Sequence, residues 1–169
     1  MKKTTIENTV LINASNAKVW TVLADFGNVS RSSPNISKSY LTSEQNEGVG
    51  TTRHCDFVSM GAQVEERIIE WEEGKLLKID IYERKNIPLI SGMEARFTLS
   101  EENEQTRLTG AMEYEMGSSI GNIINNLAMK KVNEKTWIAF LAGIKYHVET
   151  GHNVEKNTSL DTSSVSNLV

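Results

Sequence analysis

Alternation of apolar and polar residues predicts that most of the chain forms strands. In residues 5–13 the apolar side chains of Ile6, Val10 and Ile12 share one parity, which is the period-two pattern of a half-buried strand. Six more segments with strand patterns follow Pro34, and short polar turns connect most of them, as in antiparallel hairpins. These segments are residues 36–43, 49–57, 63–71, 75–84, 93–100 and 106–115.

Helical spacing of apolar residues predicts helices on either side of these strands. Ser15 can cap a helix over residues 16–25, and a second short helical turn over residues 28–33 ends before Pro34, because proline cannot continue the hydrogen-bond ladder. A long helix is predicted over residues 118–149, which contain no proline and repeat apolar residues at helical spacing. At about 1.5 Å per residue it would span roughly 48 Å, enough to lie across a whole sheet.

The predicted order is therefore one strand, two short helices, six strands and a long C-terminal helix, which is an α+β fold. A seven-stranded antiparallel sheet curls through its own twist, and a long amphipathic helix is suited to cover its concave side. We expect one domain over residues 1–150, with a cavity between helix and sheet. Residues 151–169 are rich in serine, threonine and asparagine and are expected to be a disordered tail.

Composition and charge narrow the class of protein. The chain has 169 residues, 38% hydrophobic and 24% charged, a balance typical of a single globular domain. Its net charge of −4 comes without a basic cluster, so nucleic acid is not an expected partner. The single cysteine, Cys55, cannot form an internal disulfide, and no apolar run has the length of a signal or membrane-spanning segment. We predict a cytoplasmic monomer or homodimer without stable membrane insertion.

Several short motifs resemble those of one superfamily. In chain order they are Ala-Ser-Asn-Ala-Lys-Val-Trp at 14–20, Asp-Phe-Gly-Asn at 25–28, Pro34, Gly-Val-Gly-Thr-Thr-Arg at 48–53 and Glu-Arg-Ile-Ile-Glu-Trp at 66–71. Their order and spacing resemble the SRPBCC superfamily, especially its polyketide cyclase/dehydrase branch. The resemblance covers residues 4–149 and implies the START-like helix-grip fold, a curved sheet wrapped on a C-terminal helix. Function stays open, because carriers, hormone receptors, aromatases, cyclases and interaction modules share this fold.

Glu66 is the most interesting polar position. It shares a strand parity with Val64 and Ile68, so a carboxylate lies among apolar neighbours if that parity faces the cavity. There it could act as an acid, a base or a ligand anchor, and it resembles the acidic pocket residues at the matching strand position of abscisic acid receptor-like members. The alternative is that Glu65 and Arg67 face inward and Glu66 is a solvated surface charge.

Arg53 shares a parity with Cys55 and Phe57 on the preceding strand. In a pocket Arg53 could hold a ligand carboxylate or pair with Glu66, whereas on the surface it would be an ordinary exposed arginine. A regular strand allows either Arg53 or His54 to face inward, but not both. Cys55 is expected to be a small buried hydrophobe rather than a nucleophile.

The expected cavity walls follow from the same patterns. The row that contains Met93, Ala95 and Phe97 is the clearest inward face. Tyr82 could donate to a ligand oxygen, although its alternation with charged residues favours an outward position. The predicted ligand-binding residues are Arg53, Cys55, Phe57, Glu66, Ile68, Tyr82, Met93, Ala95, Phe97, Met129, Asn133, Trp137 and Leu141.

Motifs of other chemistries give little support. His147 and His152 lack metal-binding spacing, and there is neither a P-loop nor a GxGxxG motif, so we expect no metal and no nucleotide cofactor. Residues 117–121 match GxSxG, but that nucleophile elbow belongs to a mostly parallel sheet, so we interpret the match as a helix-capping turn. The loop after Phe57 lacks the Ser-Gly-Leu-Pro gate of the plant hormone receptors, which disfavours a receptor role.

Three functions remain open. The first is a module that binds a small hydrophobic or amphipathic ligand, such as a lipid, polyketide or isoprenoid-like compound, between the sheet and the C-terminal helix. The second is an enzyme of cyclase or dehydratase type in which Glu66, with Arg53 or Tyr82, moves a proton. The third is a protein-interaction module, which a closed and filled interior would favour.

Overall fold

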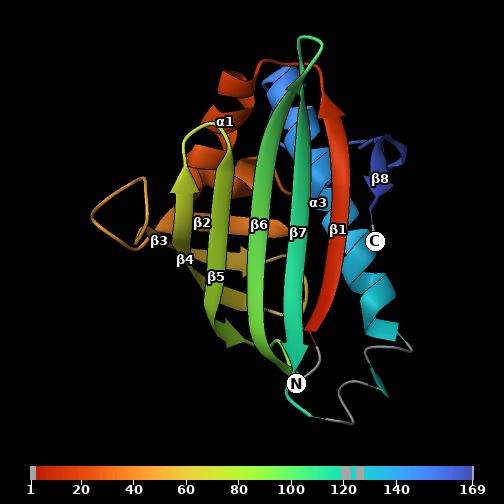
Figure 1. Ribbon diagram of the computed structural model, residues 1–169. Coiled ribbons are helices and arrows are strands. Elements are labelled where there is room, and N and C mark those ends of the chain that lie inside the picture. Colours follow the sequence, from red (N-terminus) through yellow and green to blue (C-terminus); the bar gives the residue numbers. More distant parts are fainter. Residues whose placement is uncertain (1–2, 119–122, 125–127, 169) are drawn as a thin grey trace.

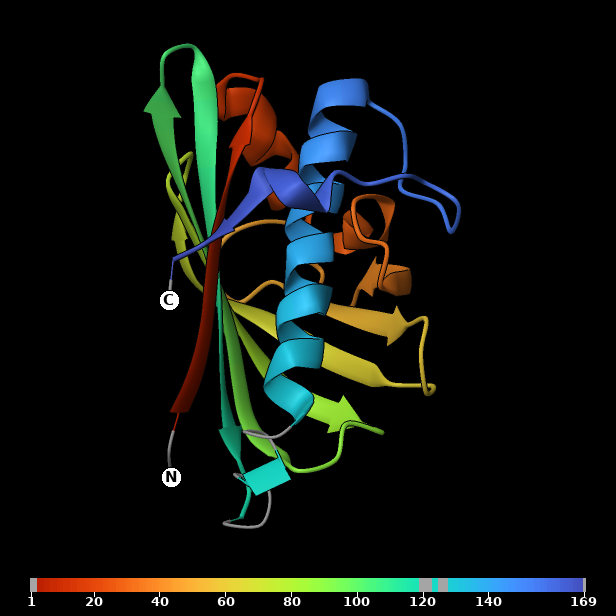
Figure 2. The ribbon, with the colours of Figure 1, turned by 90° about the vertical axis from the view of Figure 1, so that its right-hand side faces the viewer.

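The computed structural model describes residues 3–118, 123–124 and 128–168. Within these ranges an eight-stranded sheet curves around one long helix, as Figure 1 and Figure 2 show. The strands are β1 (Lys3–Ile12), β2 (Ile36–Leu41), β3 (Thr52–Phe57), β4 (Gln63–Glu72), β5 (Leu76–Lys85), β6 (Ile90–Glu102), β7 (Gln105–Met116) and β8 (Val165–Asn167). The helices are α1 (Asn16–Ala24), α3 (Lys130–Thr150) and the 3-10 helices η1 (Phe26–Arg31) and η3 (Thr162–Ser164).

The sheet has the order β2-β3-β4-β5-β6-β7-β1-β8, and every neighbouring pair is antiparallel. Strands β2 to β7 follow one another as a meander, in which short turns join all neighbours except β2 and β3, which a longer loop over residues 42–51 connects. Strand β1 then pairs with β7 over its whole length. The predicted helix-grip architecture is confirmed, but the sheet has one strand more than the seven predicted.

The additional strand comes from the C-terminal segment. The sequence predicts a disordered tail after residue 150, whereas the structure pairs β8 with β1, with Val165 opposite Val10. Val154 and Val165 are buried, and the backbone N–H of Val154 donates to the carbonyl of Arg31. The free edge of β1 offers unpaired backbone groups to any extended segment beside it. Two buried valines and this edge therefore order a segment whose composition is otherwise polar.

The two short helices after β1 form as predicted. Ser15 caps α1, since its hydroxyl accepts a hydrogen bond from the backbone N–H of Lys18. The apolar side of α1 is buried, and Trp20 makes an edge contact with Trp71 of β4 at 4.9 Å between ring centroids. Helix η1 follows directly and buries Phe26. These helices close one end of the curved sheet.

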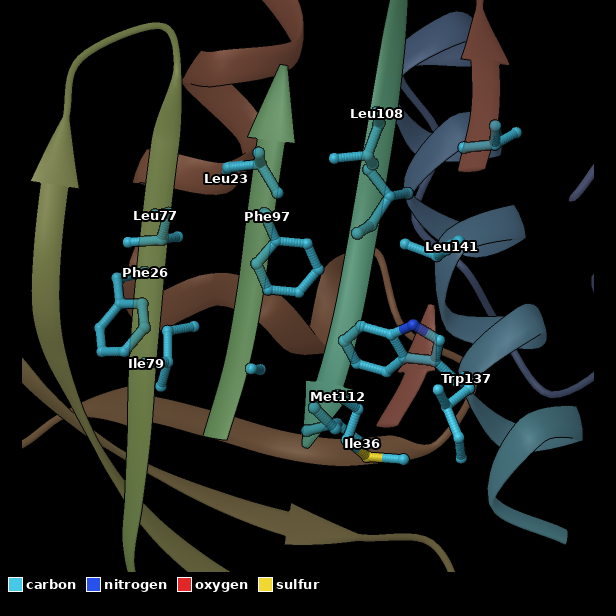
Figure 3. Packing of buried hydrophobic residues seen from close by; sticks show 14 of the residues in the cluster. Leu23, Phe26, Ile36, Leu77, Ile79, Phe97, Leu108, Met112, Trp137 and Leu141 are labelled. Atoms are coloured by element: carbon cyan, nitrogen blue, oxygen red, sulfur yellow. The ribbon is translucent and has the colours of Figure 1, made fainter. Parts of the chain in front are cut away.

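Helix α3 packs along the concave side of the sheet (Figure 2). Trp137 donates its indole N–H to the carbonyl of Gly110 at 3.0 Å and stacks on Phe97, and Figure 3 shows both rings between the helix and the sheet. A Cβ atom at Gly110 would lie only 2.8 Å from the side chain of Leu141. Glycine at this position therefore allows the helix to approach β7 closely.

The predicted long helix corresponds to α3 only in part. Among the described residues α3 begins at Lys130 and ends at Thr150, and the following residue, Gly151, takes the left-handed conformation that favours glycine. Residues 120 and 127 of the predicted helix lie outside the described residues. Positions 119 and 121 of the GxSxG match lie outside them as well.

Candidate functional site

A charged pair lies inside the curved sheet. Arg53 of β3 and Glu66 of β4 are directly opposite in register and are only 5% and 8% exposed. The Nε of Arg53 donates to Oε2 of Glu66, and its Nη1 donates to the carbonyl of Phe26 at 2.9 Å. The guanidinium also lies 3.9 Å from the centroid of the Phe26 ring, a cation–π arrangement. Helix η1 thus contributes both a carbonyl and a ring to the site.

Burial and the neighbouring groups shift the pKa values of Arg53 and Cys55. Burial opposes the charge on Arg53, but Glu66 and Cys55 outweigh it and hold the pKa of the guanidinium above its ordinary value. The Cys55 thiol lies 3.7 Å from Oε2 of Glu66. Burial, followed by the charge of Glu66, raises the pKa of Cys55 far above its usual range. Cys55 is therefore a buried neutral thiol and not a nucleophile, in agreement with the prediction.

Strand parity is settled at these positions. Arg53 and Glu66 face the interior, so the alternative in which Glu66 is a surface charge is wrong. His54 lies on the opposite face of β3, where its ring contacts the carboxylates of Glu65 and Asp56. The strand is regular here, and the pleat sends successive side chains to opposite faces.

A small cavity adjoins Arg53. Its volume is about 20 Å³, which is room for about one water molecule. Its lining is apolar except for Arg53, Asp25 and Ser32. The apolar lining residues are Val22, Leu23, Val29, Leu77, Ile79, Phe97, Phe140 and Ile144. The sequence predicts a cavity between helix and sheet, and the structure has a cavity beside Arg53. This cavity is far smaller than a typical ligand site, which has a volume of at least about 300 Å³.

Aromatic packing explains the small volume. Phe97, Trp137 and Phe140 form a cluster with ring centroids 5.4 to 5.9 Å apart. Figure 3 shows Phe97 and Trp137 filling the space between β6 and α3. Aromatic side chains bury a large area each, so three of them occupy the space in which the sequence predicts a ligand.

A larger hollow of about 450 Å³ lies on the outer face, over β4 to β7. Its charged lining is largely self-paired, because Lys78 lies 3.6 Å from Glu70 and 3.3 Å from Glu94. Exposed ion pairs of this kind contribute little energy. Ligand sites are instead mostly apolar with a few convergent polar groups. The interior around Arg53 fits that description better and is our candidate site.

Most other residues predicted to line the site do face the interior. Phe57, Met93 and Met129 are partly buried against the core, and Asn133 is half-buried on α3. The fully interior positions are Ile68, Ala95, Phe97, Trp137 and Leu141.

Tyr82 is the exception among the predicted lining residues. Its ring lies on the outer face of the sheet, 4.6 Å from the guanidinium of the exposed Arg67. On β5 the buried residues are those of the other parity, including Ile79 and Ile81. The prediction that Tyr82 lines the cavity is therefore wrong.

Two residues that contribute to the candidate site were not predicted from the sequence. Phe26 acts partly through its backbone carbonyl, which no side-chain pattern reveals. Phe140 lies three positions after Trp137 on α3 and lines the cavity. Its helical spacing from Trp137 was a usable signal, since residues three apart share a helix face.

The described residues contain neither a metal-binding cluster nor a membrane-spanning helix. Among the described ranges no group of three or more His, Cys, Asp or Glu side chains has a metal-binding arrangement. No helix in the part of the chain that the structure describes is long and apolar enough to cross a membrane.

Comparison with sequence families gives a match over almost the whole sheet and helix. Residues 3–149 match the model of the family described as polyketide cyclase / dehydrase and lipid transport. A search of curated proteins finds no match.

Solved structures with the same fold come from bacteria and plants. A protein from Thermus thermophilus has a TM-score of 0.71 at 18% identity, covering 86% of this chain and 97% of its own. Ginseng major latex-like protein 151 from Panax ginseng has 0.69 at 14%, covering 89% and 97%. Truncated norcoclaurine synthase from Thalictrum flavum has 0.66 at 16%, covering 88% and 95%. Identities this low show a common fold and do not transfer function.

Proposed function

The chain belongs to the polyketide cyclase / dehydrase and lipid transport family, and we propose that it binds a small, largely apolar molecule between the sheet and α3. The observation that carries this proposal is the buried pair of Arg53 and Glu66 beside an apolar cavity. An interior with apolar walls and one polar point of attachment is the usual design of a small-molecule site.

Stability alone does not explain such a pair. Removing two charges from water costs several kcal/mol per ion, and replacing a buried ion pair by apolar residues is often neutral or stabilising, by about 1–4 kcal/mol. Arginine and glutamate are almost never fully buried unless they are paired. A role in recognising a polar group of a ligand accounts for their position.

The charges of the pair indicate which polar group the ligand presents. Arg53 and Glu66 together are electrically neutral, and the carboxylate already occupies the Nε of Arg53. A ligand acid would bring a second negative charge beside Glu66 into a medium of low dielectric constant, which is unfavourable. A neutral carbonyl or hydroxyl oxygen avoids this repulsion. We therefore expect a neutral amphipathic ligand rather than an acid.

The structure corresponds to a closed state of this site. A ligand of ordinary size needs about 300 Å³ or more, so Phe97, Trp137 and Phe140 must move to admit it. A ligand that binds only the open state shifts the population toward that state. The helix–sheet contact near Trp137 is mostly side-chain packing, with one hydrogen bond to Gly110.

Native mass spectrometry of the purified protein, followed by denaturing extraction, is the first test. A discrete co-purifying molecule supports the proposal and identifies its chemical class. Titrations with two fluorescent probes follow: prodan, a neutral naphthalene ketone, and anilinonaphthalene sulfonate, an anion. We expect prodan to bind more tightly by tenfold or more. The double variant Arg53→Met/Glu66→Leu should lose this preference, whereas Arg96→Met on the exposed outer face should keep it.

Absence of both a co-purifying molecule and probe binding would contradict the proposal. It would favour the interaction module instead. The observation in favour of that second candidate is the closed interior, since a cavity of about 20 Å³ holds no organic ligand.

A cyclase or dehydratase mechanism would use the same pair. Glu66 would have to exchange a proton while it accepts the hydrogen bond from Arg53. Glu66 is also not among the residues that line the small cavity, whereas Arg53 is. Glu66→Gln would abolish turnover if this mechanism operated, and unchanged turnover would exclude it. Binding without proton transfer is the function that the geometry supports best.

A further inference from the structure

Exposed apolar side chains gather at one end of the molecule, where β3, β5 and β7 end and α3 begins. Six of the nine large hydrophobic residues exposed in the described ranges lie in the segments that follow these strands or begin α3. We call these six residues the apolar rim. They are Val58, Met60, Leu89, Ile123, Ile124 and Val132, with exposures between 38% and 77%.

Hydrogen bonds join the segments that carry the apolar rim. The Asn86 side chain donates to the carbonyl of Gly61 at 2.9 Å, which ties the β5–β6 loop to the β3–β4 loop. The backbone N–H of Gly117 donates to the carbonyl of Leu89 at 2.8 Å, which ties the same loop to the end of β7. These loops therefore form one continuous edge.

A second link connects this edge to α3. The backbone N–H of Val58 donates to the carbonyl of Asn35, and the Asn35 side chain donates to the carbonyl of Thr136 at 3.0 Å. Thr136 lies one turn beyond Val132 on the same helix. These hydrogen bonds thus connect the segments that carry Val58, Met60, Leu89 and Val132.

The backbone holds two of these side chains outward in an unfavourable conformation. Met60 and Leu89 have φ angles of 59° and 70°, a region that residues other than glycine seldom adopt. Met60 is also the most exposed of the large hydrophobic residues described, at 77%. Both residues lie in short connections between antiparallel strands, where turns use this conformation, and both side chains are exposed.

Lysines accompany the apolar rim. Lys85, Lys131 and Lys135 are exposed and make no ion pair within the described residues. The acidic residue of this part of α3, Glu134, lies 3.9 Å from a further lysine, Lys130. Residues 130–135 of α3 thus carry three lysines and one glutamate, an excess of two positive charges, whereas the whole chain has a net charge of −4.

We propose that the apolar rim docks on the surface of an anionic lipid bilayer. Apolar loop tips can enter the boundary between headgroups and acyl chains, while lysines remain at the anionic headgroups. Separate projecting tips suit a fluid bilayer, which needs no matching shape, better than a protein partner, which would need a complementary hollow for each tip. The docking goes beyond ligand binding in the interior and does not depend on it.

Vesicle flotation tests this proposal. Vesicles of phosphatidylcholine with phosphatidylglycerol should bind the protein at low salt, and vesicles of phosphatidylcholine alone should bind it more weakly. Each lysine near an anionic surface contributes about 1 kcal/mol, or roughly a fivefold factor in partitioning. The double variant Lys131→Glu/Lys135→Glu should therefore lose most of the binding, and added salt should weaken the binding of the wild type.

A matched pair of valine variants tests the apolar contribution. Val58 is 64% exposed in the rim, and Val49 is 60% exposed in the β2–β3 loop, at the other end of β3. Val58→Glu should reduce binding to anionic vesicles at least tenfold, whereas Val49→Glu should not. Met60→Glu repeats the test at the most exposed tip. Urea unfolding of each variant should match the wild type, because these side chains are exposed.

Three outcomes would overturn the proposal. The first is that the wild type floats with neither kind of vesicle. The second is that Val58→Glu and Val49→Glu lose vesicle binding equally. The third is that the wild type self-associates and Met60→Glu abolishes the self-association, which would identify a second copy as the occupant. The probe titrations with prodan use no vesicles, so failure of docking and failure of interior binding are distinguishable.

Discussion

Replacing Arg53 with methionine should cost about 3–5 kcal/mol in the free energy of unfolding, the range for removing one partner of a buried ion pair. The variant leaves the Glu66 carboxylate at 8% exposure without its counter-charge. It also removes the hydrogen bond to the Phe26 carbonyl and the contact with the Phe26 ring, of which the hydrogen bond alone contributes about 1 kcal/mol. Burial of an uncompensated charge is the largest of these effects.

Two further variants complete the cycle. Glu66→Gln keeps the shape and an acceptor oxygen for Arg53 but leaves the guanidinium charge unbalanced, and we expect a cost of about 2–3 kcal/mol. The double variant Arg53→Met/Glu66→Leu buries no charge. Since apolar replacement of a buried pair is often neutral or stabilising, we expect it to be within about 1 kcal/mol of the wild type. The two substitutions should therefore be strongly non-additive.

Urea unfolding followed by tryptophan fluorescence measures these differences. The chain has three tryptophans, and two of them, Trp20 and Trp137, are buried. Arg96→Met on the outer face is the matched control and should change stability by less than about 0.5 kcal/mol. Single variants that each cost under about 1 kcal/mol, or that add up in the double variant, would refute the buried pair as a coupled unit. A stable double variant that no longer prefers prodan would show that the pair serves recognition.

Three further predictions concern the cavity, an outer histidine and helix packing. Phe140→Ala should widen the interior, raise the affinity for prodan and cost roughly 2–4 kcal/mol in urea unfolding; an unchanged affinity would mean that the probe binds elsewhere. A hydrogen bond to Glu65 is the main cause that raises the pKa of His54 above 6.5 in the folded protein. The protonated His54 therefore contributes its full stabilisation below pH 6.5, and this contribution is lost as the pH rises through the pKa of the folded state. Urea midpoints of His54→Gln and the wild type should therefore converge at high pH, and a constant gap would contradict this. Gly143→Ala would place a Cβ atom 2.4 Å from the carbonyl oxygen of Ser32 and should cost about 1–3 kcal/mol, seen as a lower Tm; an unchanged Tm would show that the helix can shift.

Period-two and helical patterns predicted the order of the first seven strands and of the helices, because a half-buried strand and an amphipathic helix each leave a clear periodicity in the sequence. The helix-grip arrangement followed from the family resemblance, and β8 was missed. The patterns also predicted the pairing of Arg53 with Glu66 as one of three alternatives for Arg53, beside a contact with a ligand carboxylate and an exposed position. At Tyr82 the alternation itself was correct, because the buried residues of β5 are those of the other parity and Tyr82 lies on the outer face. Its inclusion among the lining residues rested on the hydroxyl group, which could donate to a ligand oxygen, and that prediction is wrong.

Other features depend on information that a pattern of side chains does not contain. The Phe26 carbonyl joins the site only through the three-dimensional course of η1. The volume beside Arg53 depends on how large side chains of α3 and β6 interdigitate, and similar residues could pack around a wide or a narrow cavity. The order of the C-terminal segment depends on Val165 meeting a free strand edge far away in the sequence. Each is a tertiary effect.

One stretch of α3 connects the interior with the apolar rim. Trp137 lies between α3 and Gly110 of β7, to which it is hydrogen-bonded. Val132 lies in the rim little more than one turn earlier on the same helix. Either binding can occur alone, but a movement of this stretch that admits a ligand would also displace Val132, so each binding would change the affinity of the other by the same factor. In a variant that keeps only Trp137 as tryptophan, adding anionic vesicles should therefore change the fluorescence emission, and Met60→Glu should suppress the change. Emission that stays constant while the protein floats with the vesicles would show that the interior opens elsewhere, away from the docked end.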